Sequence, residues 1–209
     1  MLTHGVPPEA RPLSREDLSI LALESETVAG HTCKVIVLDG PLDTGALRAS
    51  VARRLDRAPQ LSMRLGEIDG APWWVPDPQV DVTAHVVEAP TAGAGAGAVD
   101  EAGFRVTVAG IFAQHLDRSR PLWRIDVIPR LADGGSALIW RIHHALADGM
   151  TAMRMAGAVL WDEEPAARPR TAGSRTRARA PRAAQPAGHH RLAAVLAAAR
   201  EAPQPWLRQ

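Results

Sequence analysis

The sequence predicts an α/β (α+β) fold in which a mixed sheet is flanked by helices. The chain has 209 residues, of which 46% are hydrophobic, and this is enough to build one sizeable core. Short runs that alternate apolar and polar residues, typical of strands, lie between segments whose apolar residues recur every three or four positions, typical of helices. Some strand-like runs are separated from the others by helical segments, so we expect some strands that are distant in sequence to pair.

The first expected helix begins after the segment Pro12-Leu13-Ser14. Ser14 can cap this helix, and Asp17, three residues later, completes an approximate capping box. Leu18 and Leu21, together with Ile20, supply its apolar face. Further along we expect a strand over residues 31–39, a helix over 44–56, short strands at 61–65, 73–75 and 80–87, and a helix over about 99–115.

A hairpin and a helix are expected next. Residues 122–129 and 136–144 both alternate in polarity, and the loop Leu131-Ala132-Asp133-Gly134-Gly135 lies between them. Two such runs around a glycine-rich loop are typical of an antiparallel hairpin. A helix over residues 150–161 follows, with Met150, Met153 and Leu160 on neighbouring turns.

The composition changes after Trp161. Residues 165–188 are mainly Arg, Ala, Pro, Ser and Thr, which is typical of a linker, and residues 190–201 fit one short alanine-rich helix. We therefore divide the chain into a flexible N-terminus (1–11), a folded subdomain (12–162) and an Arg/Ala/Pro-rich linker or tail (163–209). The net charge of +1 conceals an asymmetry, because residues 165–209 contain nine Arg and one Glu. An acidic body thus carries a basic tail.

Several functional classes are disfavoured by composition. No uncharged apolar run is long enough to span a bilayer, and the first residues do not resemble a signal peptide, so we expect a cytoplasmic protein. The single cysteine, Cys33, excludes an internal disulfide framework and a cysteine-rich metal site. We interpret Cys33 as a small apolar residue in a strand rather than as a nucleophile.

The segment His143-His144-Ala145-Leu146-Ala147-Asp148-Gly149 carries the most chemistry. If the strand continues through its start, His144 shares a face with apolar Trp140 and Ile142, while His143 shares the opposite face with Arg141. A low-dielectric surrounding would keep His144 neutral, as a general base requires. His143 is better placed to orient the turn by hydrogen bonding.

The other two motif residues are interpreted as structural. Asp148 is suited to capping the following helix or to pairing with a cation, Arg141 and Arg124 being the nearest candidates. Gly149 allows a backbone conformation that other residues disfavour.

A metal site is the alternative to a general base. His144 and Asp148 would share a face if the segment were helical, but the third ligand would have to come from scattered candidates such as His115 or Asp117. We therefore expect no metal.

The block from residue 115 to residue 161 resembles bacterial wax ester synthase/diacylglycerol acyltransferases. The resemblance rests on Leu116-Asp117-Arg118-Ser119-Arg120-Pro121-Leu122-Trp123 and the HHALADG segment after it, with weaker similarity at residues 12–17 and 80–85. This family belongs to the CoA-dependent acyltransferase superfamily with an HHxxxDG motif, which also holds chloramphenicol acetyltransferase and the condensation domains of peptide synthetases. The resemblance implies a chloramphenicol-acetyltransferase-like half-domain.

The resemblance implies direct O-acyl transfer. His144 would be the general base for the hydroxyl of diacylglycerol or of a long-chain alcohol, with acyl-CoA as the donor substrate and no separate cofactor. No acyl-enzyme is expected, and substrate-binding residues are not identified. Transfer to an amine or to a carrier-bound acceptor, as in condensation domains, is an alternative.

Supporting roles are expected for aromatic and proline residues. Pro121, Leu122 and Trp123 would support the structure, with Trp123 filling the core where the hairpin meets the helices. Trp73 and Trp74 fit a half-buried strand better than the wall of an acyl channel.

Two departures from the family pattern stand out. Arg124 follows Pro-Leu-Trp where the family usually has an acidic residue, which would alter a salt bridge or local packing. The chain also supplies only the first of two similar halves between which the family's tunnel lies. We therefore expect a fragment, a truncated product or one component of a split enzyme with a separate C-terminal half, and the alternative function is a non-catalytic, lipid-binding half-domain.

The basic tail has its own set of expected partners. A solvated linker is the default interpretation, and contact with anionic lipids at a membrane or lipid inclusion, or with CoA phosphates, is the functional one. No aromatic residue is interleaved with these arginines before Trp206, so we do not expect nucleic-acid binding.

Overall fold

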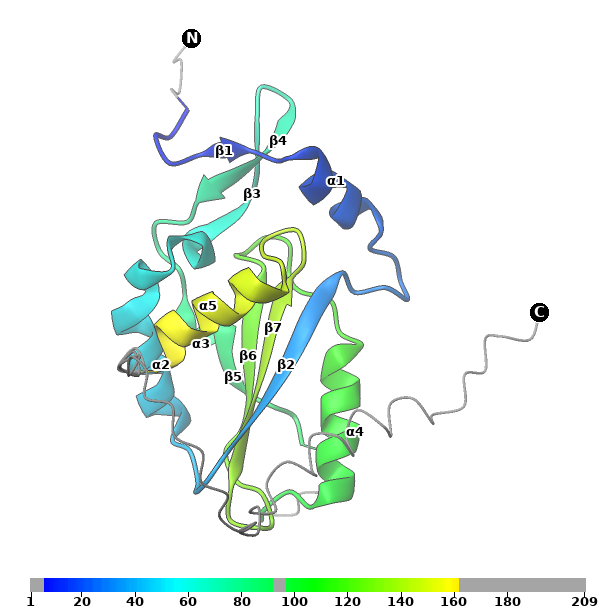
Figure 1. Cartoon of the computed structure of the whole chain (residues 1–209), viewed down its shortest axis with the longest axis vertical. Coiled ribbons are helices and arrows are strands. Elements are labelled where there is room, and N and C mark those ends of the chain that lie inside the picture. Colours follow the sequence, from blue (N-terminus) through cyan, green and yellow to red (C-terminus); the bar gives the residue numbers. More distant parts are fainter. Residues whose placement is uncertain (1–5, 92–96, 162–209) are drawn as a thin grey trace, which may run out of the picture. The chain divides into compact units, whose positions relative to one another are not determined.

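The computed structural model describes residues 6–91 and 97–161 (Figure 1). The predicted tail at 163–209, with its helix at 190–201, lies outside the described residues. The strands are β1 (Arg11–Pro12), β2 (His31–Leu38), β3 (Met63–Ile68), β4 (Ala71–Pro76), β5 (Val86–Glu88), β6 (Trp123–Ile128) and β7 (Ser136–His143). The helices are α1 (Arg15–Ala22), α2 (Thr44–Arg54), α3 (Val82–His85), α4 (Glu101–Phe112) and α5 (Gly149–Leu160), with two short 3₁₀ turns at Leu55–Arg57 and Pro59–Ser62.

The larger sheet has four strands in the order β2-β7-β6-β5. β7 pairs antiparallel with both β2 and β6, whereas β5 pairs parallel with β6, so the sheet is mixed as predicted. The predicted hairpin over residues 122–144 is confirmed as β6 and β7, with Ile125 opposite Trp140.

Helices cover both faces of this sheet, which confirms the predicted fold class. Figure 1 shows α5 (yellow) crossing one face beside α2, and α4 (green) along the other side. The α2/α5 face packs one apolar cluster that includes Val51, Trp140, Ile142 and Val159, and the α4 face packs a second that includes Ile139. Because both faces are covered, every residue of β7 is buried, and the strand's apolar residues occupy both faces.

The smaller sheet has the order β1-β4-β3. β3 and β4 form a hairpin closed by Asp69 and Gly70, which both have positive φ values, of 52° and 77°. A two-residue loop with positive φ at both positions matches the right-handed twist of the flanking strands. The buried Trp74 of β4 donates from Nε1 to Asp17 at 3.0 Å, which ties this sheet to the start of α1.

Side-chain caps fix where the helices begin. The predicted capping box is confirmed at α1, where Asp17 N donates to Ser14 Oγ at 3.0 Å and Ser14 N donates to Asp17 Oδ2 at 3.1 Å. The apolar face of this helix differs from the prediction, because Ile20 and Leu21 pack against the core while Leu18 is exposed.

The strand expected over residues 80–87 is wrong for its first part. Residues 82–85 form the helical turn α3, and only residues 86–88 are extended. The reason is local, since Asp81 accepts hydrogen bonds from both Thr83 N at 3.0 Å and Thr83 Oγ1 at 2.6 Å, which starts a turn.

No helix within the described residues is long and apolar enough to cross a membrane.

Candidate active site

The histidine motif forms the loop between β7 and α5. Residues 145–147 are buried apolar side chains in the core that α2 and α5 share, whereas His144 and Asp148 are exposed. Leu146 N and Ala147 N both donate to His143 O, at 2.9 and 3.2 Å, which closes the turn. The loop is thus anchored by its alanine and leucine residues and presents His144 at the surface.

The structure corrects the predicted surroundings of His144. Its imidazole was expected at the end of an apolar strand face, but β7 ends at His143 and the chain turns there, so His144 is exposed. Its backbone N donates to Gly30 O at 3.0 Å, and its Nδ1 lies 3.4 Å from Ala147 O. A carbonyl can only accept, so this contact favours the tautomer with the proton on Nδ1 and leaves a lone pair on Nε2.

His143 is the buried member of the pair. It is completely inaccessible to solvent, and burial lowers its pKa to about 4, so it is neutral near pH 7. Its Nδ1 accepts a hydrogen bond from Ala145 N at 3.1 Å. This bond fits the predicted orienting role, because the ring holds the backbone of the turn that follows it.

Three residues near His143 could not be identified from the sequence. Gly30 has a φ of 63°, and a Cβ atom there would lie 2.5 Å from His143 Nε2, so no side chain fits. Glu24 Oε2 lies 3.8 Å from the same Nε2 atom, and the Glu24 side chain is only 6% exposed. Arg118 donates from Nε to Glu24 Oε2 at 2.7 Å. Loops separated by about ninety residues contribute this group, and no local pattern connects them.

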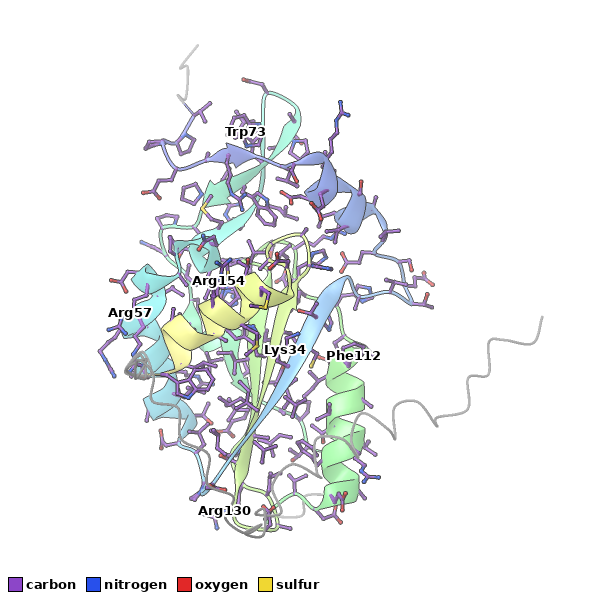
Figure 2. The ribbon with its side chains drawn as sticks, viewed as in Figure 1. Lys34, Arg57, Trp73, Phe112, Arg130 and Arg154 are labelled. Carbon is purple, nitrogen blue, oxygen red and sulfur yellow. The ribbon has the colours of Figure 1, made fainter. Side chains whose placement is uncertain are left out.

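His31 borders the same region. It lies opposite His143 in the β2–β7 pairing and contacts Phe112, whose ring centroid is 5.6 Å from its own. Figure 2 shows Phe112 at the end of α4 next to β2. Burial lowers the pKa of His31, so this ring also favours its neutral form.

Asp148 caps α5, which confirms the first of the two roles predicted for it, helix capping or pairing with a cation. It accepts from Thr151 N at 2.7 Å, and this backbone hydrogen bond lowers the pKa of the carboxyl group. The alternative pairing with Arg141 or Arg124 is wrong, because both arginines bind Asp126, at 2.8 and 2.9 Å. Arg141 also donates to Ile111 O and Gln114 O, both at 3.0 Å, at the end of α4.

The prediction for Gly149 is wrong in its physical reason. Gly149 is the first residue of α5, its φ is not positive, and a Cβ atom there would meet nothing within 4 Å. Its backbone conformation is therefore open to other residues.

Pro121, Leu122 and Trp123 lie beside the histidine loop and are buried. Leu122 O accepts from His143 N at 2.9 Å, which links this element to the motif directly. Trp123 donates from Nε1 to Leu61 O at 2.7 Å and stacks on His85 with ring centroids 4.3 Å apart. The burial of Trp123 confirms that it fills the core next to the hairpin.

Residues 13–204 match the sequence profile of the wax ester synthase/diacylglycerol acyltransferase catalytic domain. The chain belongs to this family. A probable diacylglycerol O-acyltransferase of Mycobacterium tuberculosis is 36% identical over 143 residues, which are 64% of this chain and 30% of the relative. A putative diacylglycerol O-acyltransferase of the same organism is 35% identical over 158 residues, 71% of this chain and 32% of the relative. The chain thus spans less than a third of the length of these curated relatives.

Solved structures agree with the family. The wax ester synthase/diacylglycerol acyltransferase of Marinobacter aquaeolei superposes with a TM-score of 0.56 and 29% identity, covering 70% of this chain and 36% of that protein. A single-residue variant of the starter condensation domain of rhizomide synthetase RzmA superposes with a TM-score of 0.58 and 18% identity, covering 72% of this chain and 36% of that protein. The second likeness shows a shared fold, as the resemblance to the wider superfamily implied.

Arg124, which departs from the family pattern after Pro-Leu-Trp, forms an ion pair in the structure. Arg124 pairs with the buried Asp126, and its side chain is about a third exposed. It also lines a pocket of about 400 Å³ together with His85, Asp117, Arg120 and Trp123. Arg124 therefore forms a salt bridge in this chain.

Within residues 6–91 and 97–161 no group of three His, Cys, Asp or Glu side chains could hold a metal ion. His144 and Asp148 do not lie on one helix, as the metal alternative required, because α5 begins after both. His115 Nε2 lies 2.8 Å from Ser25 O instead. Cys33 is half-buried in β2, and burial raises its pKa to about 11, so it is a thiol at neutral pH.

Proposed function

We propose that this chain supplies the general base for transfer of a fatty acyl group from acyl-CoA to a hydroxyl group. The acceptor is diacylglycerol or a long-chain alcohol, as the names of its relatives suggest. The observation that carries the proposal is the placement of His144, whose ring is exposed and directs Nδ1 toward Ala147 O, an arrangement that favours a lone pair on Nε2. A base must offer such a lone pair to the substrate.

The proposed reaction has two proton transfers and no acyl-enzyme. Nε2 of His144 takes the proton of the acceptor hydroxyl as its oxygen attacks the thioester carbonyl of acyl-CoA. The tetrahedral intermediate collapses to the ester, and the departing CoA thiolate takes the proton back from the imidazolium. Cys33 fits a role outside catalysis, because a thiol with a pKa of about 11 is a poor nucleophile near pH 7.

Acyl-CoA is the proposed donor, and no separate cofactor is needed. A double variant of the starter condensation domain of RzmA, which shares the fold, has been solved in complex with C8-CoA. The donor thioester already carries the activated acyl group, so the protein has to supply only positioning, a base and stabilisation of the oxyanion.

The exposed position of His144 favours a second component. Met150 and Met153 on α5 are 73% and 47% exposed near the loop. A wall over this surface would exclude water from the reacting groups, and curated relatives are about three times as long as the stretch they share with this chain. We propose that a C-terminal half completes the site. A non-catalytic, lipid-binding half-domain is the second candidate.

Thiol release tests the proposal. The purified chain is incubated with palmitoyl-CoA and either a diacylglycerol or hexadecanol, alone and with a separately expressed C-terminal half of a relative. We expect acceptor-dependent release of CoA that falls about 10²–10⁴-fold in His144→Ala. Val106→Ala, an exposed position on α4, is the matched control and should keep full activity.

Each outcome decides between the candidates. Release by the chain alone supports a self-sufficient enzyme, and release only with the added half supports a split enzyme. Equal release by His144→Ala would overturn its role as base. No release in either mixture would overturn the enzymatic proposal and favour lipid binding, and a preference for amine acceptors would redirect it to amide formation.

Association with lipid surfaces is a separate proposal that concerns the basic tail outside the described residues. Each arginine near an anionic surface contributes about 1 kcal/mol. Flotation of the chain with anionic and neutral vesicles, compared with a chain ending at residue 162, should show binding that depends on both the tail and the lipid charge.

A further inference from the structure

Glu24 is a buried carboxylate outside the motif. It follows α1, and its side chain is 6% exposed. Arg118, in the loop that leads to β6, donates to Glu24 Oε2 from Nε at 2.7 Å and also contacts it through its Nη2 group. The same Nη2 group donates to Leu21 O at 2.9 Å, which fixes the arginine against the end of α1.

The tautomer of His143 follows from its hydrogen bond. Nδ1 accepts from Ala145 N, so in the neutral ring the proton is on Nε2. This Nε2–H is buried and has no hydrogen-bond partner within the described residues, and the same is true of Glu24 Oε1. Buried polar groups without partners are rare because each costs free energy.

The Glu24 carboxylate and the His143 ring lie close together across a short gap. Glu24 Oε2 lies 3.8 Å from His143 Nε2, and a movement of less than about 1 Å would bring them to hydrogen-bond distance. Gly30 closes another side of the ring, since even a Cβ atom there would lie 2.5 Å from Nε2. A hydrogen bond from a neutral N–H to a carboxylate is charge-assisted and therefore strong.

We propose that Glu24, held by Arg118, is a positioning residue that accepts the Nε2–H of His143. This bond fixes the tautomer in which Nδ1 holds Ala145 N, and through that bond it fixes the loop that presents His144. The effect on catalysis rests on the proposed function, whereas the effect on His143 does not.

Two variants of equal length separate hydrogen bonding from packing. Glu24→Gln keeps an acceptor oxygen, whereas Glu24→Met fills similar space and cannot accept a strong hydrogen bond. Glu26→Ala is the matched control, because it removes an exposed carboxylate two residues away. Thermal unfolding of each full chain shows that the variants compared are folded.

Nuclear magnetic resonance of the histidine ring nitrogens in the full chain gives the direct test. In the wild type and in Glu24→Gln we expect His143 in the Nε2–H tautomer with a slowly exchanging ring proton. In Glu24→Met we expect mixed tautomers and exchange at least tenfold faster. An unchanged tautomer and exchange rate in Glu24→Met would overturn the proposal.

Activity provides a second measurement. If the chain is active alone or with an added half, Glu24→Met should lower kcat about tenfold with little change in KM, and Glu24→Gln should recover most of it. A kcat equal to wild type in a folded Glu24→Met would also overturn the role. An inactive wild type with a clear change in the His143 tautomer would refute the proposed function and leave the positioning role supported.

Discussion

The two faces of the four-stranded sheet bury different chemistry. Under α2 and α5 the sheet contributes Trp123, Ile125, Trp140 and Ile142 to an apolar cluster. On the face under α4, the sheet buries the Arg141–Asp126 ion pair in addition to a smaller apolar cluster. Apolar packing is tolerant of small changes in shape, whereas a buried charge demands its partner in place. The comparison suggests that one face mainly stabilises the fold while the other mainly fixes the ends of α4 and of β7, next to the histidine loop.

Removing one member of the ion pair should have the largest effect on stability. Asp126→Ala leaves the buried Arg141 without its carboxylate, and breaking such a pair typically costs about 3–5 kcal/mol. Ile125→Val, the neighbouring residue on the apolar face, should cost only about 0.5–1.5 kcal/mol. Urea unfolding of both variants measures the difference, and equal losses would remove the distinction between the faces.

The second-largest effect is expected from acidification, which should lower the free energy of unfolding through His143, a residue on the α4 face. The pKa of His143 is about 4 in the folded chain and about 6.5 when unfolded, so between these values the unfolded state binds more protons. The free energy of unfolding should therefore fall as the pH drops from 6.5 to 4, by about 3 kcal/mol from this group. His31 acts in the same direction, because its pKa is also lowered.

The variant His143→Gln isolates that contribution. When the free energy of unfolding is measured between pH 7.5 and 4.5, it should fall less with decreasing pH in the variant than in the wild type. Identical slopes would mean that other groups carry the dependence.

Substitution of Gly30 by alanine should destabilise the chain more than the same substitution at Gly40, a glycine of similar backbone conformation. Gly30→Ala places a side chain at a φ of 63° and against His143, while Gly40→Ala has a φ of 84° and open space. Strain at a left-handed position costs about 1–2 kcal/mol for a non-glycine residue, and the contact with His143 adds to it only at Gly30. Thermal unfolding of the pair should rank Gly30→Ala clearly below Gly40→Ala, and the reverse ranking would contradict the close packing.

The smallest effect is expected at the start of α5. Asp148→Ala removes the cap at Thr151 N and should cost about 1 kcal/mol. Gly149→Ala should leave stability unchanged or raise it slightly, because alanine favours the helix and meets no neighbour there. If Gly149→Ala proved the more damaging of the two, the glycine would need a role beyond its backbone.

Local patterns predicted most of the fold. The β6–β7 hairpin, the capping box at Ser14 and the Asp148 cap all involve residues close in sequence, so alternation and spacing were sufficient. The helical turn at residues 82–85 escaped prediction because the hydrogen bonds of one aspartate outweighed an alternating pattern.

The site was less accessible to such reasoning. The strand was extended one residue too far, which placed His144 at an apolar face although it is exposed, and the complete burial of His143 was not predicted. The hydrogen bond by which His143 holds the turn fits the orienting role predicted for it. Glu24 and Gly30 reach His143, and Arg118 reaches Glu24, only through tertiary packing. The predicted base, His144, and the acceptor it serves stay predictions until activity is measured.

The outermost position of β2 has a consequence for how the chain behaves before it is fully folded. Within the described residues β2 pairs only with β7, so its other edge carries backbone groups that could join another chain. The strand contains the β-branched run Val35-Ile36-Val37, which favours such association. Lys34, labelled on this strand in Figure 2, places a charge directly before that run. Another strand that paired with this edge would have to bury the charge, so Lys34 opposes such association.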